Sequence, residues 1–195
     1  MPQINTESYL MEQQQTDLSK FSNSWYKPGR SVIVLGMWYL VNATVFKTAF
    51  PFYAPKRALL RLFGAKIGRG LIVKPHVSIK YPWKLETGDH VWIGEKVWID
   101  NLALVKLGSN SCVSQGALLL CGNHNYKRPT FDLIVGEITL EEGAWAGART
   151  VVCGGVIMGS HSLLTVNSVA AASLEPYWIY QGNPAQKVRP REIRS

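Results

Sequence analysis

The sequence predicts an all-β fold: a parallel β-solenoid of about five coils, preceded by a helical cap and followed by a short C-terminal extension. From residue 67 onward an aliphatic residue recurs at every sixth position of the 195-residue chain. A glycine often comes directly after this aliphatic residue, and a second small or branched apolar residue comes four positions after it. A period of six fits neither a helix nor a hairpin meander, but it fits the flat sides of a three-sided coil.

Interruptions of the repeat support this interpretation. The spacing slips after residues 79, 99 and 119. When the hexads are grouped in threes, each slip falls at the end of a coil, so we expect all three insertions to leave at one corner. This hexad form resembles the left-handed parallel β-helix, an exception to the usual right-handed crossover. The positions expected in the core include Ile67, Val73, Ile79, Ile93, Ile99, Leu107, Val113, Leu119, Leu140, Ala146, Val152, Met158 and Leu164.

The residue before each core aliphatic should point outward, because side chains alternate across a strand. Many of these outward residues are apolar, among them Trp92, Trp98 and Trp145. Extended apolar surface on a soluble protein usually marks an interface. A three-sided prism packs naturally in a ring of three, so the sequence predicts a homotrimer.

The chain divides into four regions by pattern. Residues 1–24 form a polar, Gln-rich stretch expected to be a mobile arm. Residues 25–65 contain apolar runs broken by prolines and are expected to form the helical cap. Residues 66–172 form the hexapeptide β-helix, which includes a loop at 120–137, and residues 173–195 form the C-terminal extension.

Basic residues concentrate near the cap. The net charge is +8, yet residues 31–85 contain nine Lys or Arg and no Asp or Glu. Two compatible interpretations stay open: a cap that covers the open end of the solenoid, and a peripheral contact of residues 31–69 with an anionic membrane. Nucleic acid is not expected as a partner, because no nucleic-acid-binding motif accompanies the charge. The apolar run at 32–46 is too short to span a bilayer.

The composition of the chain argues against several other classes of protein. Hydrophobic residues make up 47% of the chain and charged residues 17%, which excludes wholesale disorder. Three cysteines without metal-ligand spacing and the lack of a signal peptide predict a cytoplasmic protein, at the inner face of the membrane if the cap contacts lipid. The four histidines include no close pair, so no metal is expected.

The loop at 120–137 is the candidate functional segment, because a long loop in a solenoid whose other turns are short is usually functional. It carries His124 between two asparagines, followed by Tyr126. A neutral imidazole is the natural general base for a hydroxyl nucleophile. Two alternatives remain from the residues alone: His124 as an exposed bystander, and the nearby Cys121 as a thiolate nucleophile.

Several strings in the chain are similar to one family. They are LFGAKIG (62–68), YPWKL (81–85), WIDNL (98–102), GNHNY (122–126) and GNPA (182–185). With the hexads, they resemble the hexapeptide-repeat acyltransferases, and more narrowly the colanic-acid and exopolysaccharide biosynthesis acetyltransferases. The resemblance covers roughly residues 25–193.

This resemblance implies an acetyltransferase that uses acetyl-CoA and no metal. It implies a sugar hydroxyl as acceptor, His124 as catalytic base, and an active site between trimer subunits. A backbone N–H near Gly147 or in the loop would stabilise the oxyanion. The implied acceptor-binding residues are Asp100, Asn101, Asn123 and Tyr126. The implied cofactor-binding residues are Trp145, Gly147, Ala148, Val166 and Ala171, with Lys187 and Arg189 at the phosphates.

Two further functions are compatible with the sequence. One is N-acetylation of an amino sugar on a nucleotide carrier. The other is a solenoid without catalytic activity that serves as an assembly scaffold.

Overall fold

The computed structural model describes residues 15–194, which form two units. The solenoid unit comprises residues 28–122 and 135–194, and the loop unit comprises residues 15–27 and 123–134. The part of the expected arm before residue 15 lies outside the described residues.

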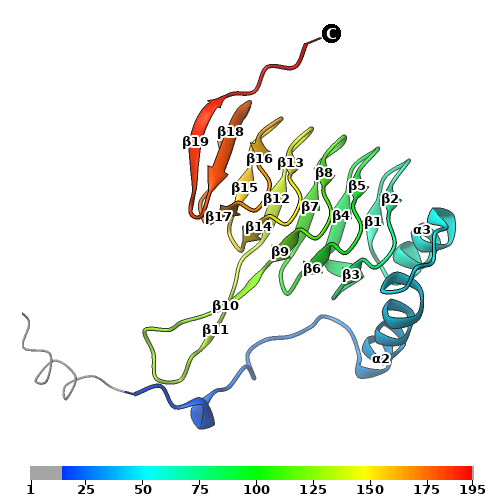
Figure 1. The fold of residues 1–195 in the computed structure, drawn as a ribbon. Helices are drawn as coiled ribbons and strands as arrows, with labels where there is room; N and C mark the ends of the chain where they lie inside the picture. Colours follow the sequence, from blue (N-terminus) through cyan, green and yellow to red (C-terminus); the bar gives the residue numbers. More distant parts are fainter. Residues whose placement is uncertain (1–14, 195) are drawn as a thin grey trace, which may run out of the picture. The chain divides into compact units, whose positions relative to one another are not determined.

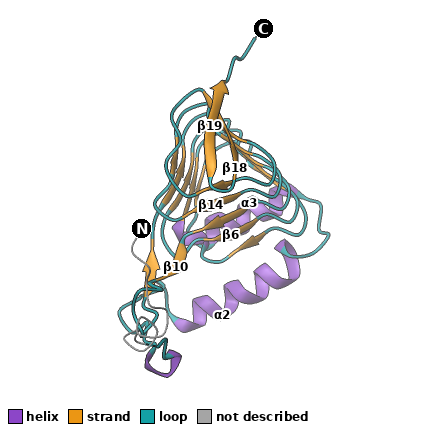
Figure 2. Cartoon of the chain, turned by 60° about the vertical axis from the view of Figure 1, so that its left-hand side comes forward, coloured by secondary structure: helices purple, strands orange, loops and turns teal. Residues whose placement is uncertain are grey.

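Three parallel sheets form the sides of the solenoid (Figures 1 and 2). Sheet A contains β1 (Lys66–Ile67), β4 (Leu85–Thr87), β7 (Val105–Leu107), β12 (Ile138–Leu140) and β15 (Ile157–Met158). Sheet B contains β2 (Ile72–Val73), β5 (Trp92–Ile93), β8 (Cys112–Val113), β13 (Trp145–Ala146), β16 (Leu163–Leu164), β18 (Trp178–Gly182) and the antiparallel β19 (Ala185–Pro190). Sheet C contains β3 (Ser78–Ile79), β6 (Trp98–Asp100), β9 (Leu118–Leu120), β14 (Val151–Cys153) and β17 (Val169–Ala170).

The predicted solenoid is confirmed, and so is the common corner of the insertions. A short helical turn, η3 (Pro82–Lys84), follows β3, residues 101–104 follow β6, and the long loop follows β9. All three lie where the chain passes from sheet C to sheet A. The expected C-terminal boundary of the coils, residue 172, lies too early in the chain. The coils continue past it, because Leu174 bridges to Met158 and β18 pairs with β16. A sixth, partial turn therefore closes the C-terminal end before β19 folds back on β18.

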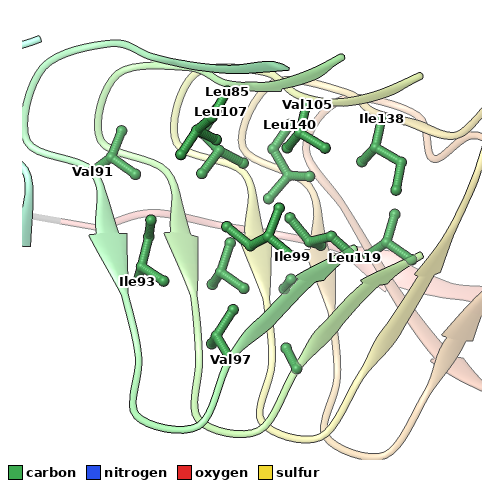
Figure 3. Close-up of a cluster of buried hydrophobic side chains, with 14 of the residues drawn as sticks. Leu85, Val91, Ile93, Val97, Ile99, Val105, Leu107, Leu119, Ile138 and Leu140 are labelled. Carbon is green, nitrogen blue, oxygen red and sulfur yellow. The ribbon is translucent and has the colours of Figure 1, made fainter. Parts of the chain in front are cut away.

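The aliphatic positions of the hexads stack inside the coils (Figure 3). In sheet C, for example, Ile79, Ile99 and Leu119 lie in register and none of their surface is exposed. Because each coil repeats the same inward positions, the core is a continuous column of apolar side chains. Its stability comes from burial between neighbouring coils.

Two helices cover the first-coil end of the solenoid (Figure 1). Helix α2 (Val32–Val41) begins at the cap residue Ser31 and continues into a π-helical turn, η2 (Asn42–Phe46). Trp38 of α2 is buried, and its Nε1 donates to the carbonyl oxygen of Ile79 at 2.9 Å. Helix α3 (Tyr53–Leu62) leads directly into β1. Within residues 15–194, no helix combines the length and apolar content needed to cross a membrane.

Bases of α3 bind the unpaired carbonyls of the first coil. The Nζ of Lys56 donates to the carbonyls of Val73 (3.2 Å) and Lys74 (3.0 Å), and none of its side chain is exposed. Arg57 and Arg61 donate to carbonyls of the same coil. An uncovered solenoid edge would pair with other chains, so these contacts both satisfy and block the edge. Desolvation lowers the pKa of Lys56 from its ordinary value.

We expect Lys56→Ala to lower the free energy of unfolding by about 2–4 kcal/mol, because it leaves buried carbonyls unsatisfied and opens a cavity. Urea unfolding followed by circular dichroism measures this. The matched control is Lys66→Ala, which removes an exposed lysine paired with Glu86 and should change little. Equal losses in the two variants would contradict a special role for Lys56 at this edge.

The outward faces of the three sheets differ in polarity. On sheet A the stacked outward residues are Lys66, Glu86, Lys106, Thr139 and Ile157. On sheet B they are Ile72, Trp92, Cys112, Trp145 and Leu163, and on sheet C they are Ser78, Trp98, Leu118, Val151 and Val169. One face is therefore largely charged or polar, and two carry apolar ladders.

Candidate active site

The loop that interrupts the coils forms its own small unit with residues 15–27. Strands β10 (Gly122–His124) and β11 (Leu133–Val135) pair at its base. The stretch expected to be a free arm makes specific contacts there. It contains the short helix η1 (Leu18–Lys20), and the N–H of Asp17 donates to the carbonyl of Pro129 at 2.8 Å.

His124 is held by contacts on three sides within this unit. Its Nδ1 lies 2.9 Å from the carbonyl oxygen of Phe131. Its ring stacks on the Phe131 ring with centroids 4.3 Å apart and 6° between planes, and the Phe21 ring meets it edge-on at 5.5 Å. Because a carbonyl only accepts, Nδ1 must carry the proton, and in the neutral ring Nε2 is left as a proton acceptor. This is the tautomer that a general base needs.

The backbone of Phe131 adopts a conformation that is rare for a bulky residue. Its φ is +50°, in the left-handed region. The turn directs the Phe131 carbonyl to His124 while the side chain stacks on the same ring. Strained backbone of this kind clusters at functional sites, where the surrounding structure maintains it.

The other three histidines occupy turn positions of the coils. His76, His90 and His161 have φ of +57° to +58°. Asn110 and Gly143 take the place of His90 and His161 in neighbouring coils, where the N–H of Asn110 bonds to Asp89 as that of His90 bonds to Arg69. Lys96, also with a positive φ, takes the place of His76 one coil later. These histidines therefore have a structural explanation, which His124 does not share.

Cys121 is poorly suited to be a nucleophile. Only 1% of its surface is exposed, and its thiol contacts the carbonyl of Ala103. Burial raises the pKa of Cys121 from 9.0 to about 11. A thiolate is the reactive form of cysteine, and here it is disfavoured by the apolar surroundings.

We expect Cys121→Ala to retain most of the acetyl transfer rate, because this thiol remains protonated and buried at neutral pH. A rise of two pKa units lowers the thiolate fraction by ~100-fold near pH 8. Alkylation of Cys121 by iodoacetamide should therefore be slow, and should accelerate as the pH rises toward 11. Peptide mass mapping measures the labelling. Rapid labelling at pH 7 together with loss of activity would restore the thiolate alternative.

The residues expected to bind the acceptor fall in both units. Asp100 lines a pocket and accepts from the Nζ of Lys80 at 2.9 Å, and its carboxylate lies beside Gly122 at the base of the loop. Asn101 is 0% exposed, and its amide bonds to the backbone of Tyr81 and Lys84. Asn101 therefore stabilises the corner between sheets C and A, and it presents no surface to a ligand.

In the loop unit, the Asn123 Oδ1 accepts from the N–H of His124 at 2.8 Å. Tyr126 is 77% exposed, so its ring and hydroxyl are open to a ligand.

Three of the residues expected to bind the cofactor gather at the corner between sheets B and C. Gly147 leaves room for the next coil, since a Cβ there would lie 2.6 Å from the Leu164 oxygen. Asn167 donates to the Ala148 carbonyl at 3.0 Å, which places Ala148 and Val166 at the same corner of neighbouring coils. The Gly147 N–H is already used by Leu164. For the next amide, of Ala148, the described part of the chain supplies no acceptor.

The structure does not bring Ala171 to this corner. It follows β17, at the opposite end of sheet C. That is the corner at which the loop leaves.

Trp145 and the C-terminal bases lie along sheet B. Trp145 donates from Nε1 to Ser114 at 2.8 Å, and Arg191 lies over its ring. Lys187 is paired with Glu175 at 2.6 Å and lies over the Trp178 ring. Arg189 is exposed, and no side-chain partner for it occurs within residues 15–194. Of the two expected phosphate-binding bases, Arg189 is the one left free.

Sequence reasoning missed Phe21 and Phe131. Both belong to the loop unit and contact the His124 ring. Their spacing follows no period, so a pattern search had no signal for them. Within the described residues, no group of three His, Cys, Asp or Glu side chains is placed to hold a metal ion.

Solved structures share this fold. A hexapeptide-repeat-containing acetyltransferase from Vibrio cholerae, solved with acetyl coenzyme A, matches with a TM-score of 0.74 and 21% identity over 83% of this chain and 88% of its own. A galactoside acetyltransferase in complex with coenzyme A matches with a TM-score of 0.70 and 22% identity over 81% of this chain and 82% of its own. At these identities the match establishes the fold, which is that of the hexapeptide-repeat acetyltransferases.

A sequence relative identifies the family of this chain within the hexapeptide-repeat acetyltransferases. The putative colanic acid biosynthesis acetyltransferase WcaF of Escherichia coli K12 is 35% identical over 176 residues, which cover 90% of this chain and 97% of WcaF. No protein-family profile matches the chain. The chain therefore belongs to the WcaF-like family of hexapeptide-repeat acetyltransferases.

Proposed function

We propose that the protein transfers an acetyl group from acetyl-CoA to a sugar hydroxyl in exopolysaccharide biosynthesis of the colanic-acid type, in the cytoplasm. The observation that carries this proposal is the Nδ1 contact of His124 with the Phe131 carbonyl, because it leaves Nε2 to accept a proton. The names of the relatives supply the donor and the class of acceptor.

The proposed reaction is a direct transfer. His124 Nε2 takes the proton of the sugar hydroxyl as that oxygen bonds to the thioester carbon. The carbonyl oxygen becomes an oxyanion, which the free N–H of Ala148 stabilises. The C–S bond then breaks, the coenzyme A thiolate leaves, and the imidazolium returns its proton to solvent or to the thiolate.

Coenzyme A would lie along the corner of Gly147, Ala148 and Val166. There the coil backbones approach closely and small side chains leave space for an extended pantetheine arm. Trp145 would flank the arm, and Arg189 would bind a phosphate of coenzyme A. Lys187 would also bind a phosphate if its ion pair with Glu175 breaks.

The oligomer would be a homotrimer that buries the ladder of sheet B and the Leu118, Val151 and Val169 part of the ladder of sheet C. A closed ring of three prisms uses two different faces of each protomer and leaves the third to solvent. The polarity of the faces fits this arrangement, since only sheet A is largely charged or polar. The corner of Gly147, Ala148 and Val166 and the base of the loop lie at opposite ends of sheet C, so a neighbouring protomer would complete the proposed site.

The product distinguishes this function from its alternatives. We expect purified protein to release coenzyme A in the presence of acetyl-CoA and an oligosaccharide acceptor, and to form an acetyl ester that mild alkali removes. An alkali-stable product would indicate N-acetylation. An intact trimer that does not bind acetyl-CoA in calorimetry would favour a scaffold.

The cap is proposed to contact the membrane on which a lipid-linked acceptor would be presented. Helix α2 contains no charged residue, and its exposed side chains include Val32, Ile33 and Leu40. Bases surround it in the sequence, and residues 31–85 contain no acid. Each base near an anionic surface contributes ~1 kcal/mol.

We expect the protein to co-sediment with vesicles containing phosphatidylglycerol at low salt, and less so as salt increases. Ile33→Glu should reduce the bound fraction severalfold, because it places a carboxylate on the apolar face of α2. Thr139→Glu on sheet A adds the same charge elsewhere and serves as the control. No sedimentation at low salt would remove the membrane contact from the proposal.

A further inference from the structure

A pocket of about 520 Å³ lies between helix α2 and the outer face of sheet C. From α2 it is lined by Val32, Leu35, Gly36, Trp38 and Tyr39. On the solenoid side, β3 and β6 contribute Ser78, Trp98 and Asp100. Both walls belong to the solenoid unit. None of the residues that form the proposed coenzyme A corner lines this pocket.

The walls of the pocket are chemically unequal. The α2 wall carries no charge, and most of its side chains are apolar. The other lining residues include Lys47, Lys80 and Asp100. Lys80 and Asp100 neutralise each other through their 2.9 Å ion pair. Lys47 is exposed and has no acidic partner within residues 15–194, so the pocket keeps one uncompensated positive charge.

Such a pocket suits an apolar chain that ends in an anion. The apolar face of α2 continues outside the pocket through Ile33, Met37 and Leu40, each more than half exposed. An amphiphile could therefore leave the lipid surface along α2 without exposing its chain to water. Asp100 lies at the solenoid end of the loop, because its carboxylate is beside Gly122, the first residue of β10.

We propose that this pocket binds the isoprenoid-phosphate part of a lipid-linked saccharide acceptor. The isoprenoid lies against α2 and Trp98, a phosphate meets Lys47, and the attached sugar extends past Asp100 toward the base of the loop. The inference rests on the proposed function, since it identifies the acceptor as a lipid-linked one.

Gly36 allows a test that does not weaken the fold. Gly36 lines the pocket and a Cβ at this position would meet no atom within 4 Å, so a leucine there adds bulk at the pocket wall without a clash at its Cβ. Replacement of a helical glycine also favours the helix. The matched control is Ala43→Leu, which adds a leucine to η2 at an exposed residue outside the pocket.

The experiment measures binding of farnesyl phosphate to the full-length protein by calorimetry, without acetyl-CoA. We expect saturable binding to the wild type and to Ala43→Leu, and at least about tenfold weaker binding to Gly36→Leu. Lys47→Gln should weaken farnesyl phosphate about tenfold and leave farnesol binding unchanged, because only the former carries the anion. Melting curves of all variants check that they are folded.

Three outcomes would overturn the proposal: no binding by the wild type, equal binding by Gly36→Leu, or equal affinity for a short-chain phosphatidic acid, which would make the pocket a site for membrane phospholipid. Because acetyl-CoA is absent, these outcomes are separate from failure of the transferase reaction itself. Pocket-dependent binding by a protein that transfers no acetyl group would support this inference and contradict the proposed function.

Discussion

His124→Ala should lower kcat for acetyl transfer by ~10²–10⁴-fold, the usual contribution of a general base. Acetyl-CoA affinity should be preserved, because the proposed donor corner belongs to the solenoid unit and His124 belongs to the loop unit. The measurement is release of coenzyme A thiol under saturating donor and acceptor, with calorimetric titration of acetyl-CoA in parallel.

The matched control is His90→Asn. His90 occupies a left-handed turn position that Asn110 occupies one coil later, so asparagine fits the backbone there. This variant should retain wild-type activity. Near-normal turnover by His124→Ala would show that another group accepts the proton, and a loss shared by both histidine variants would point to folding rather than to catalysis.

Val151→Glu should convert the proposed homotrimer to a monomer and reduce acetyl transfer to near background. Val151 lies on the outer face of sheet C between Leu118 and Val169, so the new carboxylate would be buried without a partner in the proposed interface. The effective penalty for an unpaired buried charge is several kcal/mol. Light scattering after gel filtration measures the mass, and the coenzyme A release assay measures the activity.

Two further variants make this test specific. Leu163→Glu, on sheet B, should dissociate the trimer in the same way, because a ring of three uses both faces. Thr139→Glu adds the same charge on sheet A beside Lys106 and should leave the mass unchanged. Retention of the trimer by both interface variants would contradict the assignment of sheets B and C as the subunit interfaces.

The sequence alone determined the architecture of this protein. A period of six needs no knowledge of distant contacts, since each hexad packs on the hexads one coil before and after it. The positions of Ile79, Ile99 and Leu119 and the common corner of the insertions follow from counting. The C-terminal boundary was misplaced because Leu174 and β18 continue the coil without the hexad spacing.

Only the tertiary structure supplied the geometry of the candidate site. The tautomer of His124 depends on the carbonyl of Phe131 and on a left-handed turn, which no spacing encodes. The burial of Asn101, the pairing of Lys187 with Glu175 and the pocket under α2 likewise arise where segments distant in sequence meet. Repeated local packing leaves a periodic trace in a sequence, whereas a single contact between unlike segments leaves none. The fold could therefore be predicted from the six-residue period, whereas the contacts of the loop residues could be found only in the tertiary structure.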